Sequence, residues 1–205
     1  MAISYPLALP THTGIAQIEL RASNAVAYSQ SPFTFAGQAH AYAGQMWQAD
    51  VTLPPMKRAD AEQWVAWLVS LRGQLGSFLL GDPLGATSRG LANTFAGTPI
   101  ITSQKGGTIA VTGASASKDG WLLAGDYIQI GTGSDATLHK VLQDVNTDSS
   151  GNVSLDVWPH VRGTRSESVI VADTKGRFRL ATNEQSWSIN NASVYGISFS
   201  AMEKI

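Results

Sequence analysis

Residues 53–90, LPPMKRADAEQWVAWLVSLRGQLGSFLLGDPLGATSRG, contain the one convincing helix pattern of the sequence. Pro54 and Pro55 end the strand before it, because proline has no N–H to donate to a sheet. Large apolar residues then recur at i, i+3, i+4 and i+7, which gathers them on one helix face: Trp64, Trp67, Leu68 and Leu71. We predict a helix over residues 58–72.

The ends of this predicted helix carry the usual signals. Asp60 and Glu62 place negative charge near its N-terminus, where the helix dipole favours it. Arg72 suits the last turn, and Gly73 suits the position just beyond it. A single helix cannot bury a stripe with two tryptophans by itself, so we expect it to pack against a sheet.

Much of the remaining sequence alternates between polar and apolar residues, which is typical of antiparallel strands with one packed face. The alternation is regular around Trp47, over residues 153–158 and over residues 195–199. We expect further strands over residues 15–21, 107–112, 127–130, 138–145, 168–171 and 178–181. The predicted core between helix and sheet contains Trp47, Trp64, Trp67, Leu68 and Leu71.

The pattern of strand and turn signals in the sequence changes near Asn93 and again over residues 161–168. Between these points short strands alternate with glycine-rich turns, which suits a small barrel or sandwich. The C-terminal segment is too short to form a domain alone, so we expect it to complete the N-terminal sheet. We therefore predict a mainly β fold. Its sheet domain with one packed α-helix, residues 1–94 plus 169–205, carries an inserted small β-barrel, residues 95–168.

Only 14% of the residues are charged, against about 25% in an average soluble domain, and the formal net charge is −1. Such a surface is typical of a protein that contacts other proteins. The near-neutral charge provides no basic field to attract nucleic acid. The nearest approach to a basic cluster is interpreted as a solvated or protein-contacting edge: Arg162, Arg165, Lys175, Arg177 and Arg179.

The sequence contains no cysteine, which excludes disulfides, thiolate metal sites and cysteine catalysis. The N-terminal stretch lacks a basic segment and is broken by Pro6 and Pro10, so we do not expect a signal peptide. No apolar run approaches the ~20 residues of a membrane span. We therefore expect no membrane partner.

No combination of residues indicates a reacting centre, so we expect a protein that is not an enzyme and that has no cofactor or metal. The four histidines lack the short-range pairing of many zinc sites: His12, His40, His139 and His160. The sequence has neither a phosphate-binding glycine loop nor a serine nucleophile elbow. Asp82 and Asp126 adjoin glycines and are interpreted as turn residues that bond the local backbone.

Trp121 and Trp158 are the candidates for a contact with a ligand or partner. An exposed tryptophan on a barrel can stack on a sugar ring or anchor a protein interface. Trp158 alternates with the apolar positions of residues 153–157. If those positions line the barrel interior, Trp158 points outward. The alternative is an isolated exposed aromatic residue without a role.

Residues 53–90 resemble the distal tail proteins of bacteriophages with long, non-contractile tails. The matching features are the strand end LPPM, the tryptophan-rich helix, LRG at 71–73, FLLGDP at 78–83 and SRG at 88–90. The resemblance continues through AGDYI at 124–128 and ends in Trp187 and residues 195–199. Outside residues 53–90 it is a resemblance of layout.

The resemblance implies a structural virion protein at the distal end of the tail, made in the host cytoplasm. Its copies are expected to form a hexameric ring that joins the tail tube to the baseplate hub or tail tip. Tail fibre or receptor-binding proteins are further expected partners, and DNA would pass through the lumen without specific binding. Distal tail proteins with an oligonucleotide/oligosaccharide-binding (OB)-like barrel inside the ring-forming domain have the layout predicted here.

Three alternatives remain open at this point. The first is a carbohydrate-binding module that uses Trp121 or Trp158. The second is another minor tail component, such as a tube or terminator subunit, although the predicted insertion favours the tail tip. The third is a tail-associated hydrolase, which has the least support because no pair of carboxylates is placed for glycoside hydrolysis.

Overall fold

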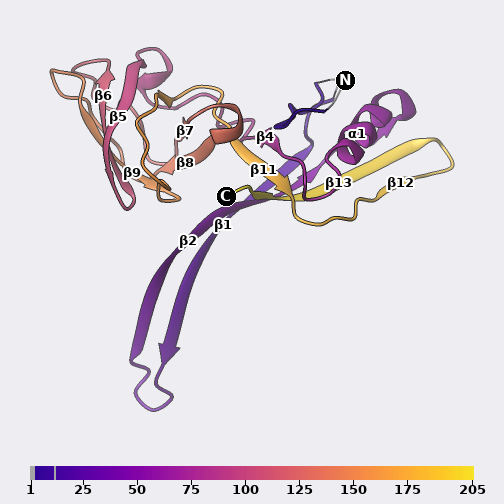
Figure 1. Ribbon diagram of the computed structural model, residues 1–205, viewed down its shortest axis with the longest axis horizontal. Coiled ribbons are helices and arrows are strands. Elements are labelled where there is room, and N and C mark those ends of the chain that lie inside the picture. The colour runs from indigo at the N-terminus through magenta and orange to yellow at the C-terminus, as the bar shows by residue number, and fades with distance from the viewer. Residues whose placement is uncertain (1–2, 12) are drawn as a thin grey trace.

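The structure is a computed structural model that describes residues 3–11 and 13–205. It consists of two β-rich lobes and a long hairpin arm that projects away from both (Figure 1). The described residues form two antiparallel sheets and a single α-helix, α1 (Arg58–Ser70). The predicted fold class, mainly β with one packed helix and a small barrel, is confirmed.

The first lobe is built on a seven-stranded sheet with the main order β1-β2-β13-β11-β4. Strands β3 and β12 pair with the first half of β13. The strands of this sheet are β1 (Gln17–Gln30), β2 (Gly37–Thr52), β3 (Met56–Lys57), β4 (Phe78–Leu80), β11 (Gly176–Leu180), β12 (Trp187–Ile189) and β13 (Val194–Glu203).

Helix α1 packs its apolar stripe on this sheet, as its sequence period requires. The Trp67 ring lies 5.0 Å from Phe78 of β4 and 5.6 Å from Phe199 of β13, measured between centroids. Trp64 meets Trp67 edge-on at 5.6 Å. Both indole N–H groups are satisfied, by Thr13 Oγ1 and by the carbonyl of Ala8, so the N-terminal segment packs beside the buried face of the helix.

The helix ends at Ser70, two residues before the predicted end at 72. Arg72 and Gly73 both adopt positive φ, 52° and 66°, which turns the chain out of the helix. A Cβ at position 73 would approach the Asn183 Cα to 2.9 Å, so this position also needs glycine for space. The predicted role of Gly73 just beyond the helix agrees with this geometry.

The second lobe is a nearly closed, barrel-like sheet of six strands in the order β10-β7-β8-β9-β6-β5. An isolated bridge between Ile100 and Ser168 joins the two outer strands. The elements of this lobe are β5 (Gly97–Lys105), β6 (Thr108–Ala114), β7 (Tyr127–Ile130), β8 (Thr137–Val141), β9 (Val153–Trp158) and β10 (Val169–Ile170), with the short 3₁₀ turns η1 (Leu91–Asn93) and η2 (Gly133–Asp135).

The barrel lobe lies between β4 and β11 in sequence, and these two strands pair with each other in the first sheet. The sheet of the first lobe is therefore interrupted in sequence but continuous in space. Strand β10 pairs with β7 in the barrel and ends at Ile170. The barrel sheet thus extends past the predicted boundary at residue 168, because the last strand is needed to approach closure.

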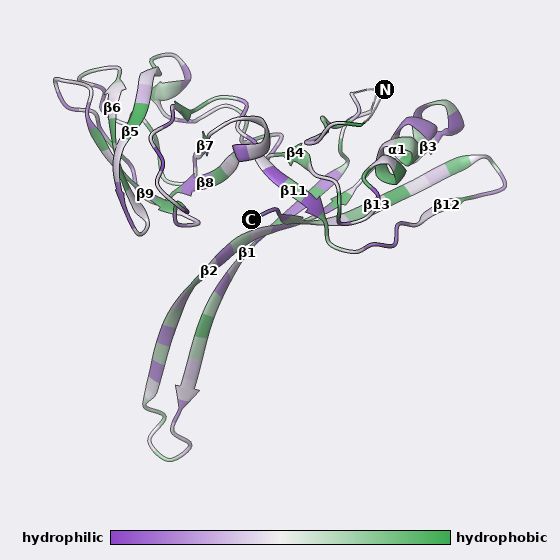
Figure 2. Cartoon of the chain, viewed as in Figure 1, coloured by the Kyte–Doolittle hydropathy of each residue, from purple (hydrophilic) through white to green (hydrophobic). Residues whose placement is uncertain are grey.

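Strands β1 and β2 continue well beyond the lobe and form the arm, which we define as residues 22–45. Sequence alternation predicts only their inner parts, over residues 15–21 and around Trp47. The two strands pair from Gln17↔Thr52 to Gln30↔Gly37, with a bulge between Asn24 and Val26. Figure 2 shows short bands of differing hydropathy along the arm instead of one continuous apolar side.

Candidate functional site

The arm presents two unpaired backbone edges. Strand β1 is the outermost strand of its sheet, and β2 pairs with β13 only between Gln48 and Thr52. Beyond Gln48, no described strand pairs with the second edge of β2. An open edge carries rows of free N–H and C=O groups, which is a template for pairing with another chain.

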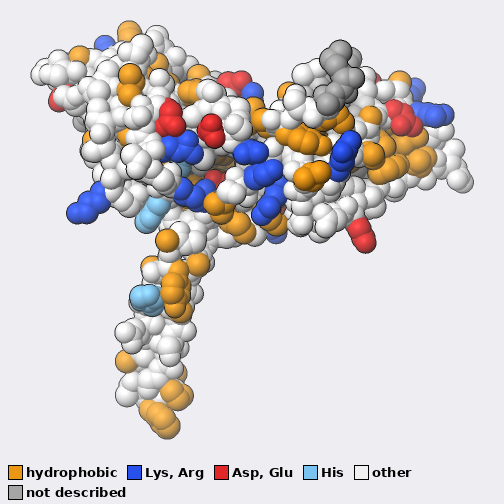
Figure 3. Space-filling view, in the orientation of Figure 1, with side chains coloured by type: hydrophobic (Ala, Val, Ile, Leu, Met, Phe, Trp, Pro, Cys, Tyr) orange, Lys and Arg blue, Asp and Glu red, His pale blue; other side chains and the backbone are white. Residues whose placement is uncertain are grey.

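The arm carries no charge that would block such pairing. Residues 22–49 contain no Asp, Glu, Lys or Arg, and Figure 3 shows none of these side chains along the arm. Natural edge strands are commonly protected by charges, by proline or by short length. A two-stranded hairpin is also only marginally stable alone in water. Its length and composition therefore suit an arm that is covered by a partner.

Exposed apolar side chains lie on both faces of the arm. Val26 and Tyr28 share one face, opposite Ala41 and Ala39 in the register. Tyr42 lies on the other face, where its ring meets His40 edge-on with centroids 4.7 Å apart. Small residues, Ala39, Ala41 and Gly37, occupy neighbouring positions of β2.

The tip of the arm is an ordered turn that displays two phenylalanines. The Phe35 N–H donates to the Ser31 carbonyl, and the Ser31 N–H donates to the Ala36 carbonyl. The Ser31 hydroxyl accepts hydrogen bonds from the Phe33 and Thr34 amides. Phe33 is 91% exposed and Phe35 is 75% exposed. The turn thus holds two aromatic rings in solvent, at the point most distant from the lobes (Figure 1).

The base of the arm is fixed to the barrel lobe. The Trp158 indole N–H, at the end of β9, donates to Asn24 Oδ1 at 2.7 Å. The His160 amide donates to Gln45 Oε1 at 2.7 Å, and Arg162 donates to the Gln45 carbonyl. These contacts hold Asn24 and Gln45, one on each strand at the base of the arm. The direction of the arm is therefore set by both lobes.

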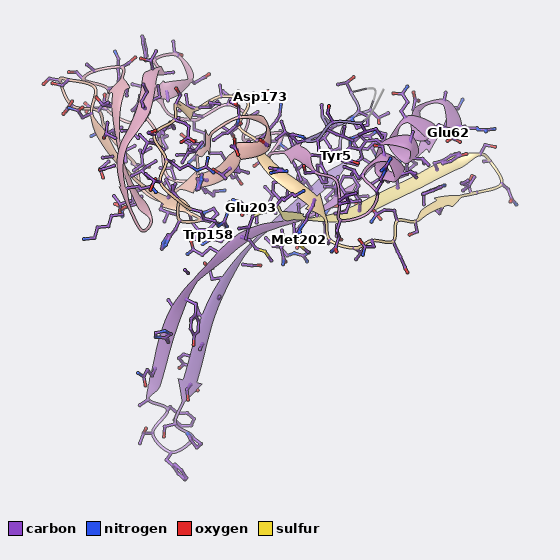
Figure 4. The ribbon with its side chains drawn as sticks, viewed as in Figure 1. Tyr5, Glu62, Trp158, Asp173, Met202 and Glu203 are labelled. Carbon is purple, nitrogen blue, oxygen red and sulfur yellow. The ribbon has the colours of Figure 1, made fainter. Side chains whose placement is uncertain are left out.

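A buried ion pair lies beside this base. Arg162 Nη1 donates to Glu203 Oε1 at 2.9 Å, and the Trp47 amide donates to Glu203 Oε2 at 3.1 Å. The Glu203 side chain is 2% exposed and that of Arg162 is 30% exposed. Figure 4 shows Glu203 and Trp158 at the junction from which the arm leaves. A carboxylate at this depth needs such partners, because burying an unpaired charge is strongly unfavourable.

His139 of β8 is buried at the same junction. One ring nitrogen, Nδ1, lies 2.7 Å from the Pro159 carbonyl, which can only accept, so Nδ1 carries the proton. Burial lowers the pKa of His139 from 6.5 to about 4; the Pro159 hydrogen bond opposes this, and Arg162 and Arg165 add to it. The imidazole is therefore neutral near pH 7 and serves packing.

The residues predicted for the helix–sheet core all lie in it: Trp47, Trp64, Trp67, Leu68 and Leu71 are buried in one cluster. Trp121 was predicted as a candidate contact residue, and this is wrong. It is 0% exposed, lies in the barrel core and donates its N–H to the Phe95 carbonyl.

Trp158 is half-buried, and its ring meets Trp47 edge-on with centroids 4.6 Å apart. It does point away from the barrel core, as predicted from the alternation over residues 153–157. However, it points into the junction with the first lobe, and its N–H is already bonded to Asn24. The contact that it makes is within the chain, and sugar stacking through Trp158 loses its basis.

The other polar candidates serve the fold. Asp82 accepts from the Leu84 amide and so bonds the local backbone as predicted. Asp126 accepts from the nearby Leu123 amide, but it also accepts from the amides of Arg89 and Gly90, which are distant in sequence, so the prediction of a purely local role is wrong for Asp126. Within residues 3–11 and 13–205, no three His, Cys, Asp or Glu residues are placed to hold a metal ion. His12 lies outside the described residues. None of the described helices is long and apolar enough to cross a membrane.

The sequence matches no model of a protein family, and a search of the curated proteins finds no match.

The most exposed aromatic residues were missed by the sequence reasoning: Tyr28, Phe33, Phe35 and Tyr42 of the arm. A usable signal was present in the sequence. The residues between Arg21 and Asp50 form a long stretch without charge. This stretch contains several Ser and Gln residues together with aromatic residues. Such a stretch on a surface indicates a segment that contacts another chain.

Proposed function

We propose that this protein is a structural subunit that assembles with copies of itself through the arm, as the distal tail protein of a bacteriophage tail tip. The observation that carries the proposal is the arm, which is long and uncharged, has exposed apolar side chains on both faces and is open along two edges. A structure of this kind has no evident use in an isolated monomer. The resemblance of residues 53–90 to distal tail proteins supplies the biological setting.

Self-assembly through the arm follows from simple geometry. The free edge of β1 in one copy and the free edge of β2 in the next can pair, because neither edge carries a charge that must be desolvated. Each copy has one edge of each kind, so the contact is head-to-tail. Head-to-tail contacts generate a ring when the rotation closes, and the expected ring is hexameric.

A ring made in this way would place arm residues around a channel. Side chains of Ala, Ser, Gln and Tyr would face passing DNA without the phosphate contacts that lysine and arginine make. Because each such contact adds affinity, an uncharged lining lets DNA move. The two lobes remain outside the arms, where they can contact the tail tube, the hub and receptor-binding proteins.

The proposal is tested by the mass of the purified protein in solution and by electron microscopy. We expect closed rings, or a concentration-dependent oligomer. Replacing residues 25–44 by an Asn-Gly turn closes the hairpin at Asn24↔Gln45, which are paired in the structure. This truncated variant should be a folded monomer. A truncated variant that assembles like the full chain would contradict the role of the arm.

A point-variant pair provides a matched control. Val26→Lys with Tyr42→Lys places a charge on each face of the arm and should abolish assembly. Leu142→Lys with Ile189→Lys introduces the same charges at exposed apolar positions outside the arm and should leave assembly intact. Open-ended tubes in place of rings would favour a tube subunit. A monomer at high concentration that binds neither tube nor hub would exclude the proposal.

A further inference from the structure

Three cations lie together on one face of the first sheet, close to the barrel lobe. Arg177 and Arg179 are two residues apart on β11, so both project from the same face. Lys204 follows β13 and lies directly opposite Arg177, because its amide donates to the Arg177 carbonyl at 2.8 Å. We call Arg177, Arg179 and Lys204 the cation cluster.

No carboxylate in the described part of the chain forms an ion pair with the cluster. Arg177 donates to Ser77 Oγ and to the Ser134 carbonyl, and Lys204 donates to the Leu75 carbonyl. Arg179 Nε is buried without a hydrogen-bond partner. Burial lowers the pKa of Lys204, and the neighbouring Arg177 and Arg179 lower it further.

Two members of the cluster, Arg177 and Lys204, border a cleft of about 230 Å³ between the two lobes. Arg177 and Lys204 line it from the sheet, and residues 134–137 line it from the barrel. Arg162 and Arg165 also reach the cleft, but each already pairs with its own glutamate. Figure 3 shows Lys and Arg side chains gathered where the lobes meet.

Like charges on neighbouring positions of one sheet face repel, which is unfavourable in the free protein. Asp135 also lines the cleft, but no ion pair joins it to the cluster, and the cations that line the cleft outnumber it. The chain contains about as many acidic as basic residues, 15 against 14, so the missing partner is not explained by composition. An anion bound in the cleft would relieve the repulsion between Arg177 and Lys204, which line it.

We propose that the cation cluster binds carboxylate groups of an acidic segment of a partner protein. Guanidinium groups match carboxylates in a planar, two-bond geometry, and side chains two residues apart on a strand match a similar spacing on an extended peptide. Nucleic acid fits less well, because its footprint is a basic stripe or face on a positively charged domain. Here the cluster is three cations beside a small cleft of a protein with net charge −1.

The test uses a hexaglutamate peptide titrated onto the full-length protein at low salt. Arg179→Gln with Lys204→Gln removes two cations and leaves Arg177, which also anchors the Ser134 loop. We expect this double variant to bind the peptide about tenfold more weakly or worse, a change of about 1.4 kcal/mol or more. Lys57→Gln with Lys105→Gln, exposed cations elsewhere, should bind like wild type.

Three further measurements make the outcome decisive. The double variant should be at least as stable as wild type in urea, because it relieves repulsion. Inorganic phosphate and duplex or single-stranded DNA should bind more weakly than the peptide. The truncated variant without the arm should bind the peptide unchanged, so failure of ring assembly and failure of this site are distinguishable. Peptide binding that is absent, or equal in both double variants, or weaker than DNA binding, would overturn the proposal.

Discussion

Trp47 of the first sheet and Trp158 of the barrel meet edge-on, with ring centroids 4.6 Å apart and planes at 89°. Trp47 is buried, and its indole N–H donates to the Leu138 carbonyl of the barrel at 2.9 Å. The two lobes therefore share a packed surface at the base of the arm. We call this packed surface between the lobes the joint. The arm extends from the joint, and the direction of the arm depends on the contacts within the joint.

Replacing Trp158 by alanine should loosen the joint. The variant loses an aromatic contact, apolar burial and the hydrogen bond to Asn24, so we expect the free energy of unfolding to fall by about 2–3 kcal/mol. Limited proteolysis should become faster between residues 22 and 45. Trp187→Ala, at an exposed tryptophan, is the control and should change stability far less. Equal effects of the two substitutions would contradict the role of the joint.

Glu203→Gln should destabilise the protein more than any exposed ion-pair substitution. Glutamine fills the same space but leaves Arg162 without its counter-charge in a largely buried site, and breaking such a pair costs about 3 kcal/mol. Glu62→Gln breaks the exposed Arg58–Glu62 pair and should stay within about 0.5 kcal/mol. Urea unfolding of both variants gives the comparison, and similar losses would argue against a structural ion pair.

The protein should lose stability in mild acid through His139. The unfolded chain takes up a proton near pH 6.5, whereas burial in the fold holds the pKa at about 4. The unfolded state thus binds more protons between these values, and stability falls as the pH falls from 6.5 to 4, by up to about 3 kcal/mol. His139→Asn keeps a donor for the Pro159 carbonyl and removes this titration.

The effect of His139 is isolated by comparing the free energy of unfolding of wild type with that of His139→Asn at each pH. Asp148 and Glu167 have lowered pKa values and also titrate in acid, but they do so in wild type and in the variant alike. The stability advantage of wild type over His139→Asn should therefore shrink as the pH is lowered from 7 to 4. An advantage that stays constant over this range would contradict the assignment to His139.

The parts of the fold that sequence reasoning predicted well are those in which one face is buried. The stripe of α1 and the alternation of Tyr195, Ile197 and Phe199 follow directly from packing against a single core. The same alternation continues through Ala201 to Glu203, so a charge occupies a core position. That departure from the pattern was a sequence signal for the ion pair with Arg162, and it was not used.

The arm could not be predicted by the same reasoning. Its strands are solvated on both faces, and its tyrosines lie on opposite faces, so no one-sided alternation marks it. The prediction that Trp121 is a contact residue was wrong for a related reason. It lies outside any regular strand, where burial depends on tertiary contacts with the barrel core and leaves no periodic signal.

The last prediction concerns Asp126, which joins two segments that the resemblance to distal tail proteins singles out. Its Oδ1 accepts from the Arg89 amide at 2.9 Å, and its Oδ2 accepts from the amides of Leu123 and Gly90 at 2.9 and 3.1 Å. Asparagine has only one acceptor oxygen, so Asp126→Asn would leave a donor facing at least one buried N–H. We expect a loss of about 2–3 kcal/mol and faster amide exchange at Gly90. Asp82→Asn keeps the single acceptor that the Leu84 amide needs and should be nearly neutral; an equal loss there would show that charge, not the number of acceptors, holds these turns.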